Sequence, residues 1–213
     1  MPTKESFIKA ISEVRKIEEE ARVKRKFNQT VDLIINLREF DIKKSSINSL
    51  VNLPHSLGEK RVAGFLEKKS EFIDSITKPE FEDFKDKKKM KSLVNSYDFF
   101  IANAKLMPLV ASTFGRALGP AGKMPSPVMG VVINEDENTI KTLIKRIGAV
   151  VKLRTKEPCI KVAIGKQSDK DENIAENAMA VFNEVFKNLP RQKENLKNIL
   201  IKFTMTKPVK VVM

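Results

Sequence analysis

The clearest regularity in the chain is an alternation of apolar and polar positions in its first quarter. Apolar residues occupy every second position there: Val31, Leu33, Ile35 and Leu37. Because successive side chains of a β-strand point to opposite faces, this spacing predicts a strand, ending near Phe40, with one buried face. A second alternation over residues 47–53 predicts another strand, which we expect to pair with the first in an antiparallel sense.

Helical spacing marks both ends of the chain. Thr3 is a suitable N-cap for a helix that runs to about Val23 and carries one apolar stripe. Towards the other end, Ser168 is expected to cap a helix whose apolar residues share one face. Strands are predicted around this second helix, and they cover residues 150–154, 159–164 and 199–205.

The middle of the chain has a different pattern, in which short apolar runs alternate with helical stretches. Strands are predicted at residues 62–66, 97–101 and 131–133, and helices at 104–114 and around 140–147. This alternation predicts a small parallel α/β unit. Antiparallel segments on both sides of it indicate an inserted domain, residues 61–147, within a discontinuous one, residues 1–60 and 148–213.

Charge narrows the class of partner. The chain has 213 residues, 41% of them hydrophobic, with a formal net charge of +13 and a pI of about 9.7. The apolar content suffices for a core, and the positive excess favours nucleic acid first and an acidic membrane surface second. Residues 1–60 and 148–213 together contain 25 of the 40 Lys and Arg residues and 16 of the 27 Asp and Glu residues, so positive charges outnumber negative ones there. The discontinuous domain is therefore expected to provide most of the attraction for phosphate.

Several chemistries are disfavoured by what the sequence lacks. It has no apolar run of about 18 residues and no charged-then-apolar leader, which predicts a soluble, intracellular protein that does not enter a membrane. Cys159 is the one cysteine and His55 the one histidine, so neither an intrachain disulfide nor a Cys/His zinc site is expected. We predict no catalytic residue, no metal and no cofactor.

The approach to the first strand combines charge with an aromatic ring. Three cations precede the aromatic residue, in the order Lys24, Arg25, Lys26, Phe27. Thr30 and Asp32 follow two residues apart and point the same way. A basic approach, a ring for stacking and short polar groups on a rigid strand suit a polynucleotide. The alternative is a phenylalanine that caps the core beside lysines in water.

The end of the last predicted strand carries a similar mixture. Thr204 and Met205 lie between Lys202 and Lys207, and Pro208 prevents the strand ladder from continuing. A hydroxyl and a thioether beside two lysines suit an RNA minor groove and its 2′-hydroxyls. The alternative is an ordinary frayed strand end.

The most unusual stretch runs from Gly115 to Pro125 and holds three glycines and two prolines. A phosphate-binding loop would require a glycine and a Ser or Thr where Ala117 and Met124 stand, so nucleotide binding is not expected. The composition predicts a shaped loop with close backbone contacts. The alternative is a simple connector.

Together these stretches resemble the large-subunit ribosomal protein L-one family, and Asp98–Ala102 resembles its archaeal branch. The order and spacing of the motifs match over essentially the whole chain. The matching segments are Lys26-Phe27 with Thr30 and Asp32, Leu53–Gly58 with Lys60, Leu118–Pro127, and Thr204-Met205.

The resemblance implies an α/β protein of two domains. A split α+β domain with a mostly antiparallel sheet made from both termini, residues 1–60 and 148–213, would bind RNA, and residues 61–147 would form an inserted Rossmann-like parallel α/β domain. The implied protein is a structural constituent of the large ribosomal subunit, not an enzyme. It would bind the rRNA stalk near the tRNA exit site and aid the release of deacylated tRNA. It is expected to be cytoplasmic, and a monomer when free.

Further partners are implied by the same resemblance. Some relatives repress translation by binding their own messenger RNA, so we expect the protein's own mRNA leader and exit-site tRNA as partners. The implied RNA contacts are Lys26, Phe27, Thr30, Asp32, Arg154, Lys202, Thr204, Met205 and Thr206. Phe27 would pack on a sugar or base, and Arg154 would neutralise a phosphate.

This sequence departs from the family pattern at three places. Thr206 stands where the family usually has Gly, so the backbone conformation and a close approach to RNA are both in question there. Ser56 also replaces a common Gly, and Asp32 replaces a common Glu and reaches one methylene less. Rival classes are a generic basic RNA-binding or nucleic-acid-processing protein and a peripheral membrane binder; the acidic first helix argues against the latter.

Overall fold

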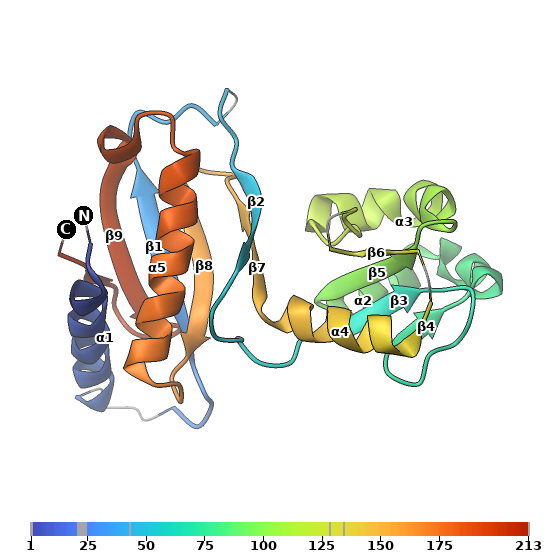
Figure 1. Ribbon diagram of the computed structural model, residues 1–213, viewed down its shortest axis with the longest axis horizontal. Helices are drawn as coiled ribbons and strands as arrows, with labels where there is room; N and C mark the ends of the chain where they lie inside the picture. Colours follow the sequence, from blue (N-terminus) through green and yellow to red (C-terminus); the bar gives the residue numbers. More distant parts are fainter. Residues whose placement is uncertain (1, 21–24, 43, 128, 134, 213) are drawn as a thin grey trace. The chain divides into compact units, whose positions relative to one another are not determined.

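The chain divides into two compact units, drawn in Figure 1 from a computed structural model that describes residues 2–20, 25–42, 44–127, 129–133 and 135–212. Unit 1 comprises residues 1–57 and 149–213, and unit 2 comprises residues 58–148. One unit is built on an antiparallel sheet and the other on a separate parallel sheet. The predicted α/β class, with an α+β part and a parallel α/β part, is confirmed.

Unit 1 has a four-stranded antiparallel sheet with the strand order β10-β9-β1-β8. Its strands are β1 (Thr30–Leu37), β8 (Cys159–Lys166), β9 (Leu196–Phe203) and β10 (Val209–Lys210). The central strand β1 comes from the beginning of the chain and all its neighbours come from the end. Both ends of the polypeptide are therefore needed to complete one sheet.

Two helices cover one face of this sheet, α1 (Lys4–Glu19) and α5 (Asp171–Asn188) (Figure 1). The apolar face of β1 that the alternation predicts turns towards them, and Val31 and Ile35 have no exposed surface. Burying one such side chain contributes about 1.5–3 kcal/mol. The alternation therefore determines which face of β1 packs inwards and which stays partly open.

Helix α1 begins as predicted. The Oγ1 of Thr3 accepts a hydrogen bond from the Ser6 N–H, and the Ser6 Oγ accepts one from the Thr3 N–H at 3.0 Å. This reciprocal capping box satisfies two amides at the helix start. The predicted continuation of the helix to Val23 falls on residues 21–24, which lie outside the described residues.

Helix α5 does not begin at the predicted cap, so that prediction is wrong. The residue at its N-cap is Lys170, which makes no side-chain capping bond. Ser168 instead accepts a hydrogen bond from the Asn28 Nδ2 at its Oγ, at 2.9 Å. The hydroxyl is used to join two loops, which no local sequence pattern reveals.

Strand β2 (Asn48–Asn52) pairs with β7 (Val150–Arg154), and the predicted pairing of the first two strands is wrong. Strand β1 has β8 on one edge and β9 on the other, which leaves no free edge for β2. The β2–β7 pair is an antiparallel ribbon that carries the chain out of unit 1 and back. A short 3₁₀-helix, η2 (Gln192–Asn195), precedes β9.

Unit 2 has a four-stranded parallel sheet with the strand order β4-β3-β5-β6. Phe65 and Phe100 belong to an aromatic cluster on one face, whereas Ile101 joins an aliphatic cluster on the other. The elements are β3 (Val62–Phe65), β4 (Asp74–Ile76), η1 (Lys78–Lys85), α2 (Lys87–Ser96), β5 (Phe99–Asn103), α3 (Met107–Ala121), β6 (Val131–Val132) and α4 (Glu137–Gly148).

The Gly/Pro-rich stretch is largely helical, which corrects the prediction of a loop. Helix α3 continues to Ala121, and Gly122 ends it with a φ of 72°. The Gly122 N–H donates to the Gly119 carbonyl and the Lys123 N–H to the Leu118 carbonyl, both at 3.0 Å. This is a Schellman motif, in which a left-handed glycine satisfies the last free carbonyls of a helix.

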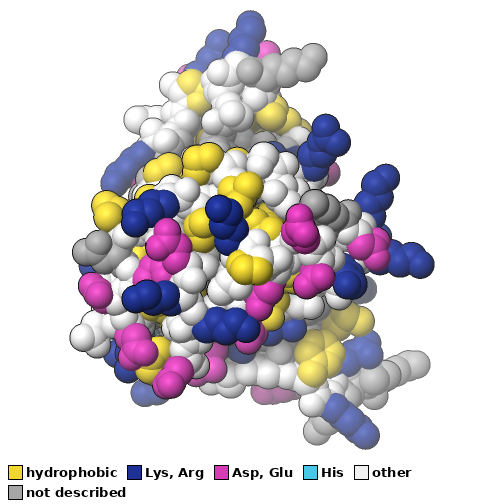
Figure 2. Space-filling model, turned by 90° about the vertical axis from the view of Figure 1, so that its right-hand side faces the viewer, with side chains coloured by type: hydrophobic (Ala, Val, Ile, Leu, Met, Phe, Trp, Pro, Cys, Tyr) yellow, Lys and Arg dark blue, Asp and Glu magenta, His cyan; other side chains and the backbone are white. Residues whose placement is uncertain are grey.

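The surface of unit 2 carries both signs of charge. Figure 2 looks onto this unit and shows Lys/Arg and Asp/Glu side chains in neighbouring patches, with apolar side chains exposed between them. In the part of the chain that the structure describes, no helix combines the length and the apolar character needed to cross a membrane.

Candidate nucleic-acid interface

Three chain segments meet at one end of the unit 1 sheet, where β1 starts and β8 and β9 finish. Thr30 lies opposite Lys166 on β8, and Val31 lies opposite Phe203 on β9. The segments that enter and leave these strands, residues 25–30, 166–169 and 204–207, therefore form one surface, which we call the β1 rim.

Backbone and hydroxyl groups join Thr30 to Thr204 across the β1 rim. The Thr30 N–H donates to the Thr204 Oγ1 at 3.2 Å, and the Thr204 N–H donates to the Thr30 carbonyl at 3.1 Å. The same hydroxyl lies 3.3 Å from the Thr30 carbonyl. These contacts hold the Thr204 side chain at the start of β1, where it is exposed to a partner.

Two large apolar side chains are exposed at the β1 rim. Phe27 exposes 52% and Met205 exposes 55% of its surface. Apolar side chains of this size are ordinarily withdrawn from water, and covering one with a partner would contribute about 1.5–3 kcal/mol. Phe27 is therefore not the core-capping residue that the alternative interpretation required.

Thr206 has a defined role inside the protein. Its Oγ1 accepts a hydrogen bond from the Phe203 N–H at 2.9 Å, and its own N–H donates to the Phe203 carbonyl at 3.2 Å. Among the described residues, the non-glycine positions with positive φ are Glu39 and Gln192. Thr206 therefore closes the turn after β9 without backbone strain, and Ser56 is likewise accommodated in an ordinary conformation.

Asp32 and Lys202 face each other on β1 and β9, on the side of the sheet that the helices do not cover. Burial raises the pKa of the Asp32 carboxyl above its ordinary value, and the charge of Lys202 opposes this change. Desolvation disfavours the charged form of a carboxylic acid, whereas a nearby cation favours it.

Each of the three segments of the β1 rim carries an exposed lysine. Lys26 is exposed on the entry to β1, Lys166 at the end of β8 and Lys207 after β9, while Lys202 is half-buried. Lys24, which the sequence places in the same basic approach, lies outside the described residues. A lysine on each of the three segments can contact phosphates, while the exposed Phe27 ring and the Thr204 hydroxyl offer stacking and hydrogen bonding.

Arg154 is not brought to the β1 rim. It lies at the end of β7, opposite Asn48. From there the chain enters β8 at Cys159, and Cys159 lies opposite Asn36, near the end of β1 that is far from the rim. Six residues of extended strand separate Asn36 from Thr30, a distance of about 20 Å. An RNA that touched both Arg154 and the β1 rim would have to extend along the sheet.

Sequence reasoning missed the residues that support the β1 rim from inside. Gln29 is fully buried, and its Oε1 accepts a hydrogen bond from the Met205 N–H at 3.0 Å. The Nε2 groups of Gln29 and Gln167 each donate to one carboxylate oxygen of Glu18 on α1. A polar residue between an exposed ring and a strand gives no local signal of such a role, because its partners are distant in sequence.

His55 belongs to a polar network with Glu176 and Lys4. Its Nε2 lies 2.7 Å from one carboxylate oxygen of Glu176, and the Lys4 Nζ donates to the other at 2.7 Å. Lys4 first, and His55 second, hold the pKa of Glu176 below its ordinary value. Within the described ranges, no group of three or more His, Cys, Asp or Glu could hold a metal ion.

The known proteins that this chain resembles match it across both units. The family described as Ribosomal protein L1p/L10e matches residues 17–207. The Large ribosomal subunit protein uL1 of Pyrobaculum calidifontis is 36% identical over 98% of this chain and 94% of its own length. The protein of the same name from Archaeoglobus fulgidus is 36% identical over 98% of both chains, and that of Thermofilum pendens is 39% identical over 88% and 86%. The chain therefore belongs to the ribosomal protein L1p/L10e family and is of its archaeal type.

Proposed function

We propose that this protein is a structural constituent of the large ribosomal subunit that binds large-subunit rRNA through the β1 rim. Membership of a family of ribosomal proteins supports a cytoplasmic, ribosome-bound protein that is not an enzyme. The observation that carries the proposal is the joint exposure of Phe27 and Met205 beside the hydroxyl of Thr204, on a surface whose three segments each carry an exposed lysine. The alternative of a nucleic-acid-processing protein receives no support from the family.

The β1 rim suits a folded RNA more than a uniform duplex. The ring of Phe27 would stack on a base or sugar, and the Thr204 hydroxyl and the Asp32 carboxylate would meet 2′-hydroxyls or base-edge donors. Lys26, Lys202 and, further along the sheet, Arg154 would neutralise phosphates. Stacking and hydroxyl contacts discriminate between RNA structures, whereas phosphate contacts only add affinity.

The finer parts of the proposal concern the stalk, the tRNA and the messenger RNA. We infer that the rRNA partner is the stalk beside the tRNA exit site, where the protein would assist release of deacylated tRNA. An RNA of similar shape in the protein's own mRNA leader would occupy the same surface, so binding of rRNA and of mRNA would be mutually exclusive. Such competition would allow the free monomer to repress its own translation.

A filter-binding comparison tests the proposal with three RNAs: the stalk rRNA, the protein's own mRNA leader and a scrambled duplex of equal length. Affinity for the stalk should fall with salt yet stay selective at high salt, because only the phosphate contacts are screened. Phe27→Ala should weaken stalk binding by roughly 1–3 kcal/mol.

Phe72→Ala is the matched control, since Phe72 is an exposed phenylalanine of unit 2, with 42% of its surface accessible. Its removal should leave RNA affinity unchanged. Equal affinity for the stalk and the scrambled duplex, or equal effects of the two substitutions, would contradict the proposal.

A further inference from the structure

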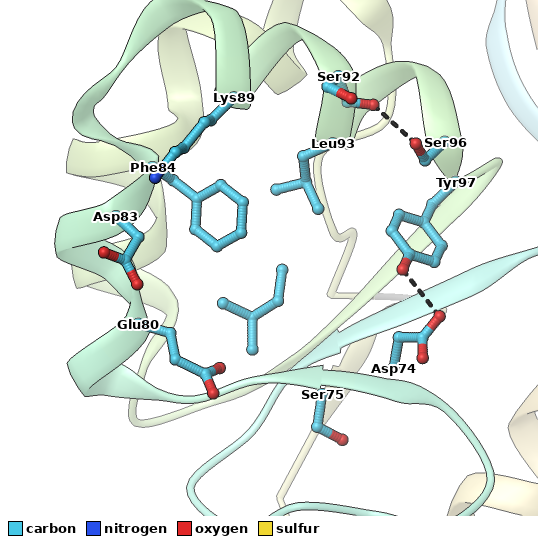
Figure 3. A pocket seen from close by; sticks show the side chains of 11 residues that line it. Asp74, Ser75, Glu80, Asp83, Phe84, Lys89, Ser92, Leu93, Ser96 and Tyr97 are labelled. Carbon is cyan, nitrogen blue, oxygen red and sulfur yellow. Dashed lines mark hydrogen bonds between the residues drawn. The ribbon is translucent and has the colours of Figure 1, made fainter.

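A cavity of about 690 Å³ opens on unit 2 between β4, η1 and α2 (Figure 3). Its inner wall is apolar: Ile76 and Leu93 are buried and Phe84 is half-buried, and all three line the cavity, with Phe84 and Leu93 labelled in Figure 3. The volume lies within the range of roughly 300–1,000 Å³ that is usual for ligand pockets.

The edge of this cavity is acidic, although the protein as a whole is strongly basic. Among the described residues that line it, Asp74, Glu80 and Asp83 are acidic and Lys89 is basic. The Tyr97 hydroxyl donates to the Asp74 Oδ2 at 2.7 Å, so the hydroxyl does not neutralise that carboxylate but orients it.

Glu80 is held in place from inside the protein. One carboxylate oxygen accepts a hydrogen bond from the Thr77 N–H at 2.9 Å, and the other lies 3.1 Å from the Lys69 Nζ. The Thr77 bond is the largest cause that lowers the pKa of Glu80 below its ordinary value. Glu80 is therefore charged at neutral pH.

Helix α2 separates two surfaces of opposite charge. Lys89, Ser92 and Leu93 face the acidic cavity, whereas Lys87 and Lys91 line a second hollow of about 420 Å³ on the other side of the helix, together with Arg116 of α3. Residues three or four apart share a helix face, so this separation follows from the sequence of α2. Nucleic acid would be attracted to the second hollow and repelled from the first.

We propose that the acidic cavity, which we call the β4–α2 groove, is a docking site for a short basic peptide segment of another protein. Lys or Arg side chains of that segment would meet Asp74, Glu80 and Asp83, and one apolar side chain would enter between Phe84 and Leu93. A phosphate backbone carries the wrong charge for this surface, and a bare metal ion would leave its apolar wall uncovered.

The test uses the full-length protein and a fluorescein-labelled six-residue peptide of alternating lysine and leucine, followed by fluorescence anisotropy. We expect saturable binding. Asp83→Lys should weaken it by about tenfold or more, because an attractive pair at the groove becomes a repulsive one. Ser92→Trp, which fills the groove from the exposed surface of α2, should weaken binding to a similar extent.

Glu71→Lys is the matched control: it changes the net charge equally, at an exposed carboxylate outside the groove. It should alter peptide affinity by less than about twofold. A peptide with serine in place of leucine should bind at least about fivefold more weakly, since the apolar contact is lost. Circular dichroism melting checks that each variant is folded.

Three results would overturn the proposal. The first is an absence of saturable peptide binding by the folded protein, and the second is equal loss of affinity in Asp83→Lys and Glu71→Lys. The third is binding of single-stranded RNA that Ser92→Trp abolishes, which would assign the groove to nucleic acid. Binding of the stalk rRNA at the β1 rim should stay the same in Ser92→Trp, so this test is independent of the proposed function.

Discussion

The Asp32 carboxylate lowers the free energy of unfolding at neutral pH, and it is one of the groups proposed to contact RNA. Burial raises its pKa despite the opposing charge of Lys202. A carboxyl whose pKa is higher in the folded than in the unfolded protein binds its proton more tightly when folded. The free energy of unfolding therefore decreases as pH rises from the unfolded to the folded pKa, and the loss persists above that interval.

Asp32→Asn should therefore stabilise the protein at pH 7 by no more than about 0.5 kcal/mol, because substitutions outside the core usually change stability within that range. The gain should disappear below a pH of about 3.9, where the carboxyl is neutral in both states. The same variant should bind stalk RNA more weakly, because an amide accepts fewer hydrogen bonds from RNA hydroxyls and amines. Urea unfolding between pH 3 and 8 and filter binding measure the two effects; a variant that is destabilised at pH 7 would contradict the argument.

Residues of the β1 rim differ in how far sequence could reveal them. Phe27 and Thr30 could be recognised because they stand next to a strand with a clear alternation. Gln29 could not, because its importance depends on hydrogen bonds to Met205 and Glu18, whose positions are fixed only by tertiary structure. The replacement of the family's glycine by Thr206 put the backbone conformation there in question. In the structure the Thr206 hydroxyl accepts a hydrogen bond that closes the turn.

At the scale of elements, helix α1 supports the β1 rim although it presents no residue of the candidate contacts. Glu18, near its end, accepts hydrogen bonds from Gln29 before β1 and from Gln167 after β8. One carboxylate thus fixes two of the three segments of the rim. Leaving a buried amide such as that of Gln29 without a partner costs about 1–3 kcal/mol.

Glu18→Ala should consequently reduce RNA affinity without removing any group that touches RNA, and should lower the free energy of unfolding by about 1–3 kcal/mol. Glu19→Ala is the control, since Glu19 is the exposed neighbour on the same helix. Urea denaturation and filter binding on both variants give the comparison. If Glu18→Ala and Glu19→Ala behave alike, the rim does not depend on α1.

Elements whose contacts are local could be predicted, and elements whose contacts are distant could not. The alternation of β1 and the capping box of α1 lie within a few residues of the structure they specify. The partner of β2 depends on which strands already occupy the edges of β1. The glycines and prolines of residues 115–125 were compatible with a loop. In the structure the residues up to Ala121 belong to helix α3, and the left-handed Gly122 ends that helix.

At the scale of the whole molecule, the change of pattern along the chain corresponds to two kinds of sheet. Strands in which apolar and polar residues alternate form the antiparallel sheet, which keeps one face partly open. Strands with continuous apolar runs form the parallel sheet, which is covered on both faces. That difference could be read from sequence because it depends on burial alone. The acidic groove could not, because its carboxylates come from β4 and η1 and only the fold brings them beside α2.

Unit 1 should fold and bind RNA without residues 58–148. Where the chain leaves and re-enters it, Asn52 pairs with Val150 and the Leu53 N–H donates to the Ala149 carbonyl at 2.7 Å. Because these points are adjacent, joining Leu57 to Ala149 through a short Gly/Ser linker closes a small loop, whose entropic cost rises only slowly with length. The hydrophobic core of unit 1 stays complete in this variant.

Circular dichroism and cooperative thermal unfolding should report a folded sheet in this deletion variant. Its affinity for the stalk rRNA should stay within about threefold of the full-length value, a difference below 1 kcal/mol. Phe27→Ala in the shortened chain should cause the same loss as in the full chain, which ties the retained affinity to the β1 rim. A folded deletion variant that no longer selects the stalk would move the interface away from the rim, because every residue proposed to contact RNA is still present in it.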